Sequence, residues 1–133
     1  MRRIVMSISM VVAVLIIGSS SAEKKDDHPM DVSYWMKKKL DLTKDVMVGL
    51  ASSDFEELEN CAKTIRTLNT IEGWVRRAET KEYRRQLKFF EQANENLLTH
   101  ALDENLDGAA LAFTQMTLSC VNCHKHLRDS TSP

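Results

Sequence analysis

The chain has 133 residues, enough for one small domain but not for several. Its 18 lysines and arginines face 19 aspartates and glutamates, so the formal net charge is −1. Proteins that bind nucleic acid usually carry a basic excess, and this chain has none. We therefore expect no nucleic acid among its partners.

The first element is an apolar run from Ile4 to Ile17, which follows two arginines and closes on small residues up to Ala22. This order is typical of a secretory signal peptide, and the run is shorter than the roughly 20 residues that span a bilayer. We expect residues 1–22 to be a cleaved signal peptide and residues 23–133 to be an exported, periplasmic domain with no stable membrane insertion. An uncleaved membrane anchor is the alternative.

Downstream of the leader, apolar residues recur every three or four positions, which is the period of amphipathic helices. The first helix is expected from about Asp31 to Ala51. Its predicted inward stripe is Val32, Met36, Leu40, Thr43, Met47 and Leu50. Ser53 and Glu56 form a capping box for a second helix, which residues 69–73 are expected to break.

The third helix is predicted to begin near Thr80 and to end before residues 103–107. The fourth is predicted to be capped by Asp107 and to run to about Arg128. Each apolar stripe must be buried, and a short connection can only turn the chain back. The sequence therefore predicts an all-α fold, an antiparallel up-down-up-down four-helix bundle.

The last helix carries a C-x-x-C-H motif, formed by Cys120, Cys123 and His124, which is the attachment signature of c-type haem. At about 100° per residue, the two thiols and the imidazole fall within roughly 100° of one helix face. The cysteines can then tether one haem c while His124 binds its iron as proximal ligand. The expected export agrees with this, because such attachment takes place outside the cytoplasm.

Other interpretations of the motif stay open. A thioredoxin-like redox pair needs its first cysteine at a helix N-terminus, whereas Cys120 lies late in a predicted helix. A zinc site of Cys120, Cys123, His124 and His126 lacks a second, distant pair of ligands. In a haem-free helical adaptor the pattern is a coincidence. The third cysteine, Cys61, fits a core stripe as a small buried hydrophobe.

The four predicted helices, and the motif continued by Leu127 and Arg128 in the last of them, resemble the class II c-type cytochromes. This is the family of cytochrome c-prime and its low-spin relatives, and the resemblance covers essentially the whole domain after the leader. It implies an electron carrier that meets redox partner proteins, and family members often form homodimers. No catalytic acid–base or nucleophilic set is visible, so we expect no enzyme.

The resemblance also implies a sixth iron ligand. Low-spin relatives place a methionine in the first helix, and Met36 matches that position at the level of His124. Met47 and Met116 lie about 16 Å and 12 Å away by helical rise and are expected to fill the core. If Met36 does not bind, the iron is five-coordinate and open to nitric oxide or carbon monoxide. Both hypotheses stay open.

Further residues are candidates for the surroundings of the haem. Trp74 is a candidate to cover the porphyrin, and Arg76, Arg77 or Arg128 to pair with its propionates. Each is equally compatible with an ordinary surface residue. Lys37 to Lys39 are expected to form a solvated helix face, with a docking patch for an acidic redox partner as the alternative.

Overall fold

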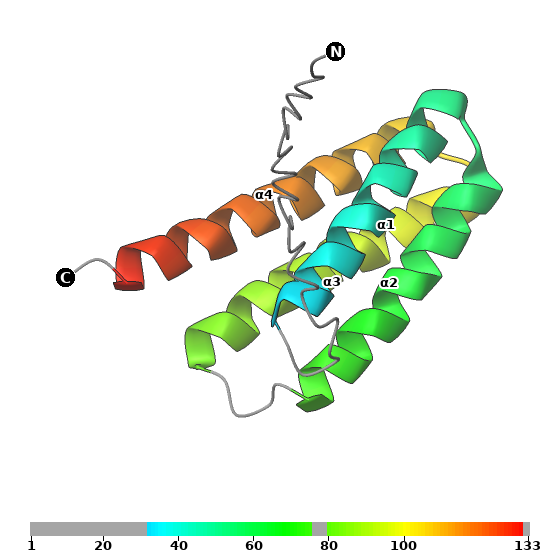
Figure 1. Cartoon of the computed structure of the whole chain (residues 1–133). Helices are drawn as coiled ribbons and strands as arrows, with labels where there is room; N and C mark the ends of the chain where they lie inside the picture. Colours follow the sequence, from blue (N-terminus) through cyan, green and yellow to red (C-terminus); the bar gives the residue numbers. More distant parts are fainter. Residues whose placement is uncertain (1–31, 76–79, 132–133) are drawn as a thin grey trace, which may run out of the picture.

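The computed structural model describes residues 32–75 and 80–131. In these two stretches the chain forms four helices and no strand, namely α1 (Val32–Ser52), α2 (Phe55–Val75), α3 (Lys81–Leu102) and α4 (Leu106–Thr131). The helices pack against one another (Figure 1), which confirms the predicted all-α fold and is consistent with a four-helix bundle. None of the four is long and apolar enough to cross a membrane. The predicted signal peptide lies outside the described residues.

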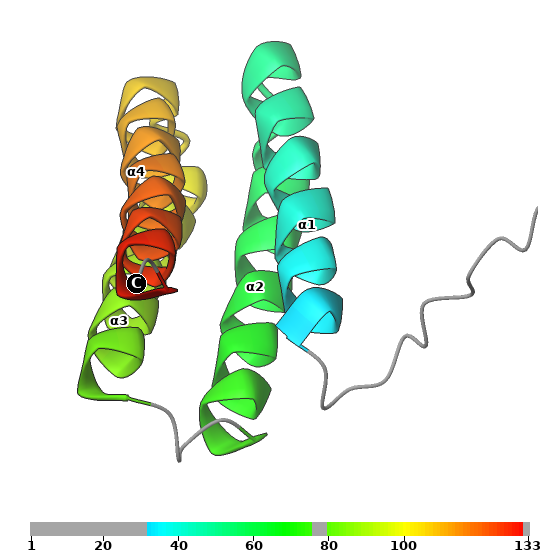
Figure 2. The same cartoon turned by 60° about the vertical axis from the view of Figure 1, so that its left-hand side comes forward.

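The connections between the helices show which helix ends lie at the same end of the bundle. Residues 53–54 join α1 to α2, and residues 103–105 join α3 to α4, at the same end of the bundle (Figures 1 and 2). At the opposite end α1 begins, α2 ends, α3 begins and α4 ends (Figure 2). Residues from the start of α1 and the end of α4 therefore share a level.

Side-chain caps set where the helices begin. Thr80 accepts a hydrogen bond from the backbone N–H of Tyr83 at 3.1 Å, so the predicted start of the third helix is confirmed. At the start of α2, Oδ1 of Asp54 accepts from the N–H of Glu57 at 3.0 Å. The predicted capping box at Ser53 is wrong, because Ser53 has a φ of 56° and belongs to the turn.

Two other expected boundaries are also wrong. Asn105 caps α4 in place of Asp107, since its Oδ1 accepts from the N–H of Gly108 at 2.9 Å. Residues 69–73 do not break α2, which continues to Val75. Asparagine and glycine are weak helix formers, but intrinsic propensity costs only fractions of a kcal/mol per residue and packing against neighbours overrides it.

The cap at Asp54 gives a first test. Asp54→Ala is expected to lower the free energy of unfolding by about 1 kcal/mol, because it leaves a helix-end N–H without its acceptor. Ser53→Ala, one residue earlier, is the matched control and is expected to change it by less than about 0.5 kcal/mol. Urea denaturation followed by circular dichroism measures both. A larger loss for Ser53→Ala than for Asp54→Ala would reinstate the capping box.

The hydrophobic core fills the space between the four helices. Its buried members are Val46, Leu58, Cys61, Ala62, Ile65, Phe90, Ala93, Leu97, Leu98, Ala101, Ala109, Ala112 and Met116. The expectations that Met116 fills the core and that Cys61 is a buried hydrophobe are confirmed.

The buried face of α1 differs from the predicted stripe by about one position. Trp35 and Val46 are buried, whereas Leu40 and Met47 are 55% and 57% exposed. The expectation that Met47 fills the core is therefore wrong. The apolar residues of α1 cover more than one stripe, and the face that carries Met36, Leu40 and Thr43 borders a cavity instead of the packed core.

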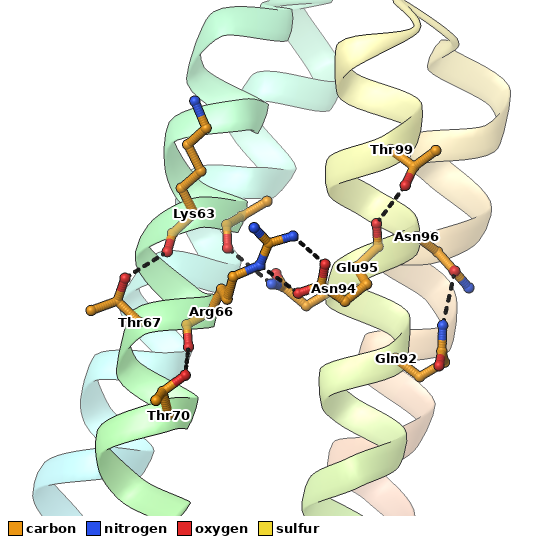
Figure 3. A network of polar contacts seen from close by, with 10 residues as sticks. Lys63, Arg66, Thr67, Thr70, Gln92, Asn94, Glu95, Asn96 and Thr99 are labelled. Carbon is orange, nitrogen blue, oxygen red and sulfur yellow. Dashed lines mark hydrogen bonds and ion pairs between the residues drawn. The ribbon is translucent and has the colours of Figure 1, made fainter.

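Polar contacts join α2 to α3 across the middle of the bundle (Figure 3). Nδ2 of Asn94 donates to the backbone carbonyl of Ala62 at 2.9 Å in a buried position. Nearer the surface, the Arg66 guanidinium donates to both carboxylate oxygens of Glu95, with Nε 2.6 Å from Oε1. The buried bond fixes the register of the two helices, since slippage would leave buried polar groups unpaired.

Candidate cofactor site

A cavity of about 450 Å³ opens between α1, α3 and α4. Its walls are mostly apolar, and none of the residues that line it comes from α2. They are Met36, Lys37, Lys39, Leu40 and Thr43 on α1, Tyr83, Gln86, Leu87 and Phe90 on α3, and Thr117, Ser119, Cys120, Cys123 and His124 on α4. Cavities of roughly 300–1,000 Å³ with apolar walls and a few polar groups are the usual form of cofactor and small-molecule sites.

Four predicted site residues meet in this cavity. Cys120, Cys123 and His124 line it from α4, and Met36 lines it from α1. The helical repeat explains the first three, because positions three and four apart lie on one face. Met36 joins them because α1 begins at the end of the bundle where α4 ends.

Other candidates lie elsewhere. Trp74 is 78% exposed on α2 and does not line the cavity. Arg128 is exposed on α4, also outside the lining residues. The roles suggested for these two residues stay predictions. Arg76 and Arg77 lie outside the described residues.

The two cysteines of the motif are half-buried free thiols. Burial raises the pKa of the Cys120 thiol, and the nearby Lys39 ammonium opposes this only in part. Burial likewise raises the pKa of Cys123. Both shifts disfavour the thiolate, which is the reactive form in thiol–disulfide exchange. The thioredoxin-like interpretation finds no support here.

Metal binding by protein side chains alone was the other chemical alternative. Within residues 32–75 and 80–131, no three histidine, cysteine or carboxylate side chains gather in a way that could hold a metal ion. The zinc interpretation therefore gains no support from this part of the chain.

The cavity residues fit the haem that the motif predicts. Two thiols and an imidazole stand on the α4 wall, and the thioether of Met36 stands on the α1 wall. Cysteine pairs, histidine and methionine are the donor set of His/Met c-type haems. Apolar walls suit a macrocycle whose faces are hydrocarbon.

A buried ion pair beside the cavity was missed by the sequence analysis. Nζ of Lys39 lies 2.6 Å from Oε2 of Glu72, whose side chain is fully buried. The Tyr83 hydroxyl donates a hydrogen bond to Oε1 of the same carboxylate. The Lys39 ammonium also lies 4.8 Å from the centroid of the Phe90 ring. This network ties α1, α2 and α3 together at the cavity wall.

The expectation of a solvated face at Lys37 to Lys39 holds for the first two lysines, which are exposed, but is wrong for Lys39. Glu72 continues the inward positions Ile65 and Asn69 of α2, so the helical period pointed to it. The expected break at residues 69–73 concealed that signal. Nothing in the sequence around Lys39 indicated that this lysine would be buried.

Comparisons with known proteins add no relative: no protein-family model, curated protein or solved structure matches the chain. The resemblance to class II cytochromes therefore stays a prediction that rests on the motif and the helical pattern.

The third cysteine, Cys61, allows a test of how burial divides the reactivity of the three thiols. It is buried on α2, and burial together with its hydrogen bond to Glu57 raises its pKa to about 12. At pH 8 its thiolate fraction is about a thousandfold below that of an ordinary thiol. In folded chain made without haem, iodoacetamide is expected to label Cys120 and Cys123 well before Cys61, and all three after unfolding in urea. Peptide mapping by mass spectrometry reads the order, and early labelling of Cys61 would contradict its burial.

Proposed function

We propose that the chain is an exported monohaem c-type cytochrome that carries one electron between redox partner proteins, in the manner of the low-spin class II cytochromes. Its haem c is attached to Cys120 and Cys123, with His124 as proximal and Met36 as distal iron ligand. The bundle is antiparallel, up-down-up-down, with the haem near the C-terminal end of α4. The observation that carries the proposal is that these four residues line one cavity.

A haem bound in this cavity supplies an iron that exchanges one electron between its ferric and ferrous states. The two cysteine sulfurs keep the cofactor from being lost in a dilute extracytoplasmic space. His124 would hold the iron through its imidazole from the α4 wall. The apolar walls from Leu87 and Phe90 exclude water, which favours the less charged, reduced state.

Met36 decides between the two haem hypotheses. A thioether ligand raises the reduction potential and occupies the position that a small gas would need. Met36 stands half-buried on the cavity wall, on a different helix from His124. This position supports a closed, six-coordinate site rather than an open one that binds nitric oxide or carbon monoxide.

The proposal is tested by the absorption spectra of the purified chain, made in a host with c-type cytochrome maturation machinery. We expect a Soret band, a low-spin reduced spectrum, a weak sulfur-to-iron band near the red end when oxidised, and no change with carbon monoxide. Cys120→Ala with Cys123→Ala is the control and should lose the covalent haem. A high-spin spectrum that responds to carbon monoxide would assign gas binding instead. A colourless protein would favour the haem-free adaptor.

A further inference from the structure

Charge is divided between the two ends of the bundle. The half of each helix nearer the cavity comprises residues 32–42, 66–75, 80–90 and 118–131, called the cavity end below. It holds ten lysines and arginines against four carboxylates, a net charge of +6. The other halves, residues 43–65 and 91–117, hold two against ten, a net charge of −8. Within the residues that the structure describes, whose net charge is −2, the charge is therefore strongly divided between the two ends.

The positive charges of the cavity end lie largely at the surface. The Lys39–Glu72 pair is buried and cancels itself, which leaves the excess of +6 on exposed or half-exposed side chains. Lys37 is exposed and lines the cavity, and Lys125 is exposed next to His124. Some of these side chains are paired: Arg85 lies 2.8 Å from Glu82, and Arg66 pairs with Glu95 of the other half.

The cavity end also exposes large apolar side chains. Leu40, which lines the cavity, is 55% exposed, and Val121, between the two attachment cysteines, is 54% exposed. An apolar centre within a charged rim is the usual anatomy of a protein–protein interface. A solvated charged surface needs no such centre, and large exposed side chains on it cost solubility.

The distance between the two ends lets them act separately. A helix of 21 residues is about 30 Å long, whereas charges at physiological ionic strength are screened over about 8 Å. A partner at the cavity end therefore experiences the positive charge, and the negative end orients the molecule before contact. Such complementarity raises the association rate and selects the orientation in which partners meet.

We propose that the cavity end is a docking surface for a partner protein with an acidic patch, which meets the mouth of the cavity face to face. This inference rests on the proposed function, because it names the partner class with which the bound haem exchanges its electron. The exposed basic side chains of the cavity end include Lys37, Lys38, Lys81, Arg85 and Lys125, and of these Lys37 lines the cavity itself, as does Leu40.

A first experiment needs no haem. Binding of poly-L-glutamate to the folded chain is measured by isothermal titration calorimetry at low and physiological salt. We expect binding that weakens with salt, and an affinity about tenfold lower for Lys37→Glu with Lys125→Glu. Lys63→Glu, an exposed lysine in the other half, is the matched control and should bind as the parent chain does. Equal loss in the control, or no binding at all, would overturn the docking surface. Tighter binding of duplex DNA would replace the acidic protein by nucleic acid.

A second experiment separates this inference from the proposed function. The holoprotein is oxidised by ferricyanide, an anion, and by tris(phenanthroline)cobalt(III), a cation, over a range of ionic strength. We expect the ferricyanide rate to fall with added salt, the cobalt rate to rise, and both slopes to flatten in the double lysine variant but not in Lys63→Glu. Coloured protein with equal slopes in all variants would refute the docking surface and leave the cytochrome proposal intact. Colourless protein that still binds poly-L-glutamate as expected would refute the cytochrome proposal and leave the docking surface intact.

Discussion

Glu72→Gln is expected to lower the free energy of unfolding by about 3–5 kcal/mol, although it changes a single atom. The substitution leaves the Lys39 ammonium buried without its counter-charge, 2.6 Å from where the carboxylate stood. Adding Lys39→Met to Glu72→Gln is expected to restore much of the loss, because no uncompensated charge remains. Chemical denaturation of the four members of this double-mutant cycle gives the coupling between the two side chains.

An exposed ion pair in the same protein provides the matched control. Glu59 on α2 pairs with Lys63, whose side chain is 55% exposed. Surface pairs contribute about 0–1 kcal/mol, so Glu59→Gln is expected to change the free energy of unfolding by less than about 1 kcal/mol. A loss of similar size for Glu72→Gln would mean that water reaches the buried pair and that the network does not hold the cavity wall.

Met36→Ala is expected to have the largest effect on the cofactor. On the proposed ligation, the holoprotein changes from low-spin to high-spin, loses the sulfur-to-iron band, gains carbon monoxide binding and falls in reduction potential, because the thioether ligand is gone. Absorption spectra with and without carbon monoxide, and a potentiometric titration, measure these changes.

Two other methionines serve as controls for Met36. Met47 lies exposed on the same helix, and Met116 is fully buried on α4. Met47→Ala is expected to leave the spectrum and stability unchanged. Met116→Ala is expected to cost about 2–5 kcal/mol of stability while the iron stays low-spin. An unchanged spectrum in Met36→Ala would remove this residue from the coordination sphere and call for another ligand.

The amino-acid pattern predicted the helices better than their ends. Four segments in which apolar residues recur every three or four positions were enough to predict four helices, because this spacing marks the side of a helix that is buried. The caps were predicted correctly at Thr80 but not at Asp54 or Asn105. In both missed cases a neighbouring residue offered an equally good capping side chain, and only the turn's backbone conformation chooses between them.

The site divides in the same way. One short motif predicted that Cys120, Cys123 and His124 share a helix face, and topology put Met36 at their level. The four residues do line one cavity, and their role in binding haem stays a prediction. The Lys39–Glu72 pair could not be predicted, because it joins two helices through charged side chains that a hydrophobic pattern treats as solvent-facing. The predicted inward stripe of α1 was also wrong by about one position. This helix carries apolar residues both on the face that packs into the core and on the face that borders the cavity, and the apolar spacing alone does not distinguish the two faces.

The central claim is a covalent bond between haem and the C-x-x-C-H motif, and intact mass spectrometry under denaturing conditions tests it most directly. Chain made in a host that attaches haem is expected to weigh one haem more than the polypeptide. A tryptic peptide containing Cys120 and Cys123 should carry the added mass, and Cys61 should be the one titratable thiol of the three. A bare polypeptide mass with three free thiols, from a culture in which another c-type cytochrome matures normally, would contradict the account.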